Sequence, residues 1–141
     1  MSARADRYTG RARPEVRSDL DVSFMLNPVT SSISRVADDA AVAQSIRLTV
    51  LTFNGEWPFE PDNGSEVPRA LFEPSDPVSM DVLALSVSEA IRNRCSSYAH
   101  LVGCVAVPSA RDSRAVTVVV AYRATGSNTT STLSVVLRRI R

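Results

Sequence analysis

Lysine is absent from this chain of 141 residues, so arginine supplies all 16 of its basic residues. With 15 acidic residues the net charge is only +1, which disfavours a protein that binds nucleic acid over its whole surface. Long apolar runs are lacking too, since none approaches the roughly 20 residues of a membrane-spanning helix. The start of the chain has no apolar core of a secretory signal. We therefore expect one globular domain that is not exported, without membrane or nucleic acid among its partners.

Cysteine and histidine are equally scarce. Cys95 and Cys104 are the only cysteines, and His100, the only histidine, lies between them. A structural zinc site needs about four ligands, so this set is one short. We expect reduced cysteines of an intracellular protein and no metal or other cofactor.

Residues 1–18 are polar and aperiodic, and five arginines lie among the first 17 residues: Arg4, Arg7, Arg11, Arg13 and Arg17. Alone, such a segment is expected to be disordered. It is either a mobile tail or an arm that orders on a partner, because arginine is favoured in interfaces. A third hypothesis is that the arm itself binds nucleic acid. Residues 19–141 are expected to form the folded domain.

Two stretches have the period of a helix. From about Asp39 to Thr52, Val42, Ile46, Val50 and Phe53 follow one another at helical spacing, and Asp38 and Asp39 are candidate caps. From about Pro77 to Arg94 the apolar face is clearer, and Asp76 is the expected N-cap. The apolar positions of this second helix are Met80, Leu83, Val87 and Ile91.

The end of the chain changes to the period of a strand. Residues 101–107, 115–124 and a segment around Leu133, Val135 and Leu137 predict three strands joined by polar turns. Two successive hairpins make a small open antiparallel sheet, with the two helices packed on one face, which is an α+β fold. Earlier, alternating Leu20, Val22 and Phe24 predict a short extended segment, and residues 29–37 are expected to be a loop.

Between the two helices lies a connector, residues 54–73, that holds the only tryptophan, two of the five glycines and three of the eight prolines. Trp57, Phe59, Leu71 and Phe72 are expected to pin it against the sheet. Its acids invite a glycosidase hypothesis, which needs two carboxylates at a defined separation; they are Glu56, Glu60, Asp62, Glu66 and Glu73. Nothing in their spacing singles out a pair, so we expect no enzyme.

The connector carries a spaced pattern that resembles a known family. Gly55-x-x-Pro58-Phe59-x-Pro61-x-x-Gly64, followed by Leu71-Phe72-Glu73-Pro74, is similar to the signature of the contractile-tail baseplate wedge proteins that initiate the sheath. This family is named after the gene 25 product of the T-even phages and includes a type VI secretion baseplate component. The similarity extends over about residues 19–138. We take Gly55, Pro58, Phe59, Pro61, Gly64, Leu71, Phe72 and Glu73 as structural residues of this signature.

The resemblance implies a structural protein of the virion tail baseplate, assembled in the host cytoplasm and present in six copies around the tube. Its sheet would resemble the strand-exchange domain of tail sheath proteins and would accept sheath strands by β-augmentation. The implied partners are baseplate wedge proteins, the tail sheath protein and hub proteins near the tube. Some family members are labelled lysozymes, so a peptidoglycan-degrading baseplate enzyme is the alternative function.

One position departs from the family. Members usually carry Glu-Pro-Arg after the long helix, in a contact with the wedge core, where this chain has Cys95, Ser96 and Ser97. Arg92, Arg94 or the arm are the candidates to replace that contact. The candidate partner-binding residues lie on the strands and around charged ends: Val116, Val118, Leu133, Val135, Leu137, Arg138, Arg139, Arg92 and Arg94.

Overall fold

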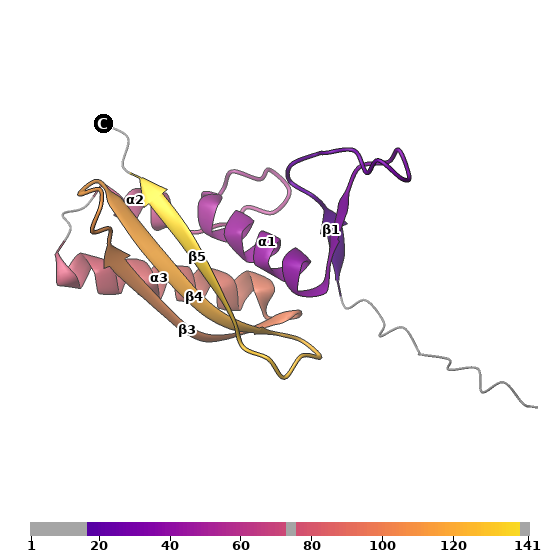
Figure 1. Ribbon diagram of the computed structural model, residues 1–141. Coiled ribbons are helices and arrows are strands. Elements are labelled where there is room, and N and C mark those ends of the chain that lie inside the picture. Colours follow the sequence, from indigo (N-terminus) through magenta and orange to yellow (C-terminus); the bar gives the residue numbers. More distant parts are fainter. Residues whose placement is uncertain (1–16, 73–75, 139–141) are drawn as a thin grey trace, which may run out of the picture.

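The computed structural model describes residues 17–72 and 76–138. The elements follow one another as β1, β2, α1, α2, α3, β3, β4 and β5. Figure 1 shows α1 and α3 packed behind one face of the sheet β3–β4–β5, with the small β1–β2 pair beyond the start of α1. None of the helices in these two ranges is long and apolar enough to cross a membrane.

The first predicted helix is confirmed as α1, Asp38–Leu51, in which Val42, Ile46 and Val50 are fully buried. Its predicted capping is wrong. The N-cap is Ala37, which offers no side-chain acceptor, and both aspartates lie inside the first turn. There the two negative charges lie near the positive end of the helix dipole, which stabilises the helix. Asp39 instead accepts hydrogen bonds from Ser131 Oγ at 3.1 Å.

The second predicted helix is confirmed as α3, Pro77–Cys95, with Met80, Leu83, Val87 and Ile91 in the core. Asp76 is its N-cap and accepts a hydrogen bond from the Ser79 amide at 2.6 Å. That bond favours the carboxylate and lowers the pKa of Asp76 below its usual value. Proline follows the cap because its missing amide proton would have no partner in the first turn.

The predicted three-stranded meander is confirmed: β3 (Ala99–Pro108), β4 (Ala115–Ala124) and β5 (Ser131–Arg138) pair in the order β3–β4–β5, all antiparallel. Val118 lies opposite Ala106 on one side and Val135 on the other. The register of β3 shifts at Leu101/Gly103, a β-bulge. The fold is α+β, with the helices on one face of the sheet, as predicted.

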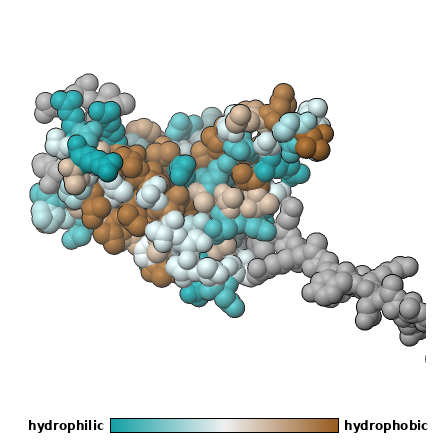
Figure 2. Space-filling model, in the orientation of Figure 1, coloured by the Kyte–Doolittle hydropathy of each residue, from teal (hydrophilic) through white to brown (hydrophobic). Residues whose placement is uncertain are grey.

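The core lies between the helices and this face of the sheet. Val116, Val118, Val120 and Tyr122 of β4 are buried there with apolar residues of α1 and α3. The opposite face of the sheet carries exposed Val105, Val107 and Val136. Figure 2 shows apolar side chains gathered on the side of the molecule where the sheet lies.

The segment before α1 differs from its prediction. Only Ser18–Leu20 form β1, and Arg35–Ala37, expected to be loop, form its antiparallel partner β2. Leu20, Val22 and Phe24 alternate as a half-buried strand would, yet all three are exposed because no other described segment covers them. The side chain of Gln44 on α1 holds this hairpin by donating to the Leu20 carbonyl at 2.7 Å and accepting from the Val22 amide at 3.2 Å.

The connector also departs from its prediction. It contains a short helix, α2 (Val67–Ala70), with proline in its first turn. Three of the four expected anchors are exposed: Trp57 at 51%, Phe72 at 79% and Phe59 at 97%. Leu71 alone packs against the core as expected. The connector is held instead by polar groups and by the buried Val67.

Candidate functional site

The sheet has two open edges. β4 is paired on both sides, whereas no other strand of the described chain pairs with the outer edge of β3 or of β5. Open edges present unpaired amide and carbonyl groups that attract another strand. The β3 edge is interrupted by the bulge and ends in Pro108, while β5 keeps one register with β4 from Ser131 to Arg138. β5 is therefore the more regular template.

The apolar residues predicted to bind a partner have their side chains in the core. Leu133, Val135 and Leu137 are buried on β5, so their side chains are not available to a partner, and β5 can offer a partner the main chain of its open edge. Val116 and Val118 are buried on the central strand, and both of its edges are already paired. These two positions offer a partner neither a side chain nor an edge. Partner contact at β5 stays a prediction.

The arginines predicted to bind a partner lie apart. Arg138 ends β5, and its Nε lies 3.1 Å from a carboxylate oxygen of Asp112 in the β3–β4 turn. Arg92 is exposed in the last turn of α3, and Arg94 forms an ion pair with Glu60. Arg139 lies outside the described residues.

Two glycines of the signature shape the path of the connector after α1. The Gly55 amide donates to the Pro61 carbonyl at 2.7 Å, and Gly55 has φ 82°, which favours glycine. Gly64 passes so close to the chain that a Cβ there would lie 2.5 Å from the backbone of Phe53. Pro58, Phe59 and Pro61 are exposed, and Glu73 lies outside the described residues.

Three connector acids have local partners. Glu56 accepts the Phe53 amide at 2.9 Å, Glu66 accepts the Asn54 side-chain amide at 3.0 Å, and Glu60 holds Arg94. These contacts fix the path of the connector. In the described ranges, no group of three or more His, Cys, Asp or Glu side chains is placed to hold a metal ion.

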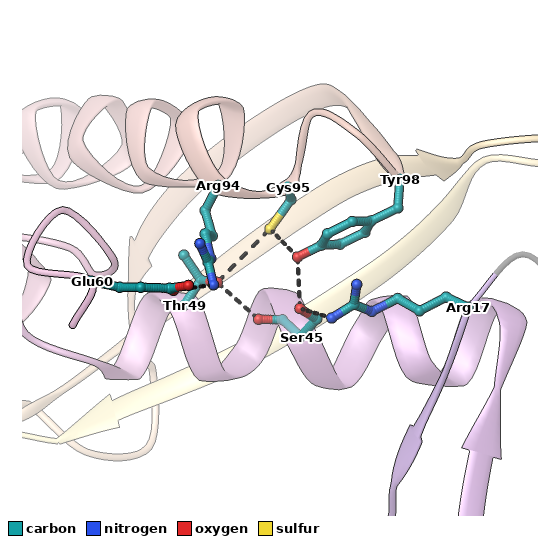
Figure 3. Close-up of polar contacts among 7 residues, drawn as sticks. All are labelled: Arg17, Ser45, Thr49, Glu60, Arg94, Cys95 and Tyr98. Atoms are coloured by element: carbon teal, nitrogen blue, oxygen red, sulfur yellow. Dashed lines mark hydrogen bonds and ion pairs between the residues drawn. The ribbon is translucent and has the colours of Figure 1, made fainter. Parts of the chain in front are cut away.

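A polar pocket of about 340 Å³ lies where β1, α1, the connector and the end of α3 meet. Figure 3 shows the network on its wall, in which the hydroxyl of Tyr98 lies between Ser45 Oγ and Cys95 Sγ, at 2.7 and 3.2 Å. Arg17 stacks its guanidinium 4.0 Å from the centre of the Tyr98 ring and donates to Ser45 Oγ at 3.3 Å. We call this the Arg17–Arg94 pocket, lined by Arg17, Asp19, Ser45, Leu48, Thr49, Thr52, Trp57, Asn63, Arg94, Ser97 and Tyr98.

Burial governs the titration of the groups near this network. Desolvation, reinforced by Cys95, raises the pKa of Tyr98 above its usual value, so the phenol stays protonated and can donate. Desolvation likewise raises the pKa of Cys104, which favours its thiol form.

Sequence reasoning did not bring these residues together. Ser45 and Tyr98 are 53 positions apart, and Arg17 was assigned to the arm. No periodicity marks Tyr98 or Asn63, since each lies just outside a regular element. Only the tertiary packing of α1 against α3 creates the pocket.

Two solved structures share this fold. One is the crystal structure of a Geobacter sulfurreducens protein named as a candidate tail lysozyme, with TM-score 0.64 and 22% identity, over 71% of this chain and 89% of that one. The other is a chain of the anti-feeding prophage baseplate, with TM-score 0.58 and 18% identity, over 85% and 83%. No protein-family profile and no curated protein sequence matches this chain. At these identities the likeness establishes the fold alone.

Proposed function

We propose that this chain is a structural component of a contractile-tail baseplate that links wedge subunits to the tail and templates the sheath. The observation that carries the proposal is an α+β domain whose three-stranded sheet is open at both edges. The fold recurs in a chain of the anti-feeding prophage baseplate, which supports the setting. The connector pattern supports the gene 25-like sheath initiators as the particular family.

The chemistry of the proposed function is strand addition. Leu133, Val135 and Leu137 anchor β5 in the core, which fixes its open edge as a rigid row of donors and acceptors. An incoming sheath strand gains main-chain hydrogen bonds there, and the outward side chains of β5 select among strands. Several copies around a tube raise the effective concentration for each further contact.

A proline in the proposed template strand tests the role of β5. Val135→Pro fixes φ and removes an amide proton from the strand, so we expect baseplates that no longer extend a sheath. Val135→Ala is the control, because it also removes core packing but keeps the amide. Electron microscopy of assembled tails gives the readout. Normal sheath on Val135→Pro tails would exclude β5 as the template.

The second candidate function is peptidoglycan hydrolysis, favoured by the name of the Geobacter neighbour. We propose that the chain lacks this activity, because the carboxylates of Glu56 and Glu60 already bind the Phe53 amide and Arg94. A peptidoglycan-clearing assay on the purified chain decides between the two. Clearing that is lost in Glu56→Gln or Glu60→Gln, with the fold retained, would support an enzyme.

A further inference from the structure

We infer that the Arg17–Arg94 pocket binds a carboxylate side chain in an acidic segment of another protein. The pocket combines two guanidinium groups that are far apart in the sequence, Arg17 before β1 and Arg94 in the last turn of α3. A guanidinium fork matches a carboxylate in geometry and charge. This site is separate from the open edges of the sheet and does not depend on sheath templating.

One buried polar atom of the pocket residues lacks a hydrogen-bond partner within the described chain. Arg17 Nε is buried and makes no hydrogen bond there. Asn63, another residue of the lining, is only 8% exposed. Buried donors without acceptors are rare because they lose the hydrogen bonds that water would make. A carboxylate bound to this guanidinium supplies the kind of acceptor that it lacks.

Arg94 already shows the chemistry that we assign to the pocket. Its Nη2 pairs with a carboxylate oxygen of Glu60, which comes from the exposed connector. A neighbouring hollow of about 330 Å³ shares Arg94 and Asn63 with the pocket and is lined by Phe59, Glu60 and Pro61. The two hollows lie side by side, and we call them together the groove.

The residues around the groove are of the types that are found in protein interfaces. Trp57 and Leu48 are about half exposed at the pocket, and Phe59 is almost fully exposed at the neighbouring hollow. Tryptophan, tyrosine and arginine are the residues that dominate binding energy in interfaces. The acids Asp19 and Glu60 beside the two arginines leave little net positive charge, which suits a single carboxylate better than the many charges of a nucleic acid.

Trp57 allows a direct test, because it is the only tryptophan and lies on the pocket wall. The full chain is titrated with a capped peptide that has one glutamate flanked by leucine and alanine, and with the same peptide carrying glutamine. We expect saturable quenching by the glutamate peptide with a midpoint below about 1 mM, and at least tenfold weaker binding of the glutamine peptide. Equal binding of both peptides, or no saturable signal from either, would overturn the inference.

Variants assign the binding to the arginines. Arg17→Gln and Arg94→Gln should each weaken the glutamate peptide about tenfold, while Arg17→Lys should weaken it less because it keeps the charge but loses the fork. Arg111→Gln, in the β3–β4 turn, makes the same change of charge outside the pocket and should have no effect. Circular dichroism checks that each variant is folded. Two results would contradict a carboxylate site. The first is that Arg17→Gln and Arg94→Gln weaken binding of the glutamate peptide no more than Arg111→Gln does. The second is that the chain binds single-stranded DNA more tightly than the glutamate peptide and with a strong dependence on salt.

Discussion

At the scale of single residues, the connector depends on the absence of a side chain at one position. Gly64 lies where the chain returns beside the end of α1, and the neighbouring Ser65 amide donates to the Thr52 carbonyl at 2.8 Å. The Ser65 hydroxyl, which is buried, donates to the Val50 carbonyl at the same distance. These bonds hold the connector tightly against α1, so a Cβ at residue 64 has backbone, and not a movable side chain, as its neighbour.

Gly64→Ala should therefore destabilise the protein, by about 1–3 kcal/mol, because the connector must shift away from Phe53. Gly103→Ala is the matched control, since a Cβ there meets nothing within 4 Å. Urea unfolding followed by circular dichroism measures both. Equal stabilities for the two variants would show that the close approach is not maintained in solution.

Tyr122 makes the free energy of unfolding depend on pH in the alkaline range. Desolvation is the main reason that its pKa rises from 10.0 to about 12, and Asp39 adds to the shift. Since the folded-state pKa lies above the unfolded one, the folded chain holds the proton more tightly. The contribution of Tyr122 to the free energy of unfolding is therefore fully present below pH 10 and is lost as the pH rises toward 12.

Tyr122→Phe should remove this loss. We expect the variant to show a weaker fall of unfolding free energy between about pH 10 and pH 12 than the original chain. Denaturant titrations at several pH values in this window make the comparison. Parallel curves for the two proteins would mean that other groups cause the alkaline loss.

At the scale of elements, long periodic segments were predictable and short ones were not. Val116, Val118 and Val120 alternate over ten residues of β4, and α3 repeats its apolar face over 19 residues, so each pattern identifies its element. β2 and α2 have three and four residues, too few to establish a period. Their structure comes from contacts with distant segments.

The exposed aromatics of the connector show a second limit. Phe59 and Phe72 have the composition of core residues, but whether such a side chain is covered depends on the tertiary arrangement. Pattern reasoning assumes that every apolar residue finds a covering layer. Where a protein presents apolar groups outward, that assumption fails, and such patches are typical of interaction surfaces.

The side chain of Gln44 is one of the groups that hold the N-terminal hairpin on α1. Gln44 bonds both the Leu20 carbonyl and the Val22 amide, so Gln44→Ala should loosen the hairpin without unfolding the core. We expect hydrogen exchange of the Val22 amide to speed up about tenfold, which corresponds to the loss of roughly 1.4 kcal/mol of local stability. Arg47→Ala, at an exposed position of the same helix, is the control. Unchanged exchange at Val22 would show that the hairpin is held in another way.

At the scale of the whole molecule, the domain has a packed interior and several exposed surfaces that could contact a partner. These surfaces are the open edges of the sheet, the N-terminal hairpin and the groove. One face of β3–β4–β5 is covered by α1 and α3, and its edges and other face are open in the described chain (Figure 1). Figure 2 shows apolar groups both near the sheet and at the N-terminal hairpin. This distribution fits a subunit that is completed by its neighbours.

A density map of a contractile tail assembled with this chain tests the proposed function most directly. We predict that a strand from the first ring of sheath subunits pairs with an open edge of β3–β4–β5, and that this edge is β5. A map in which both edges face solvent, or in which β5 is covered by a subunit that adds no strand, would contradict the account.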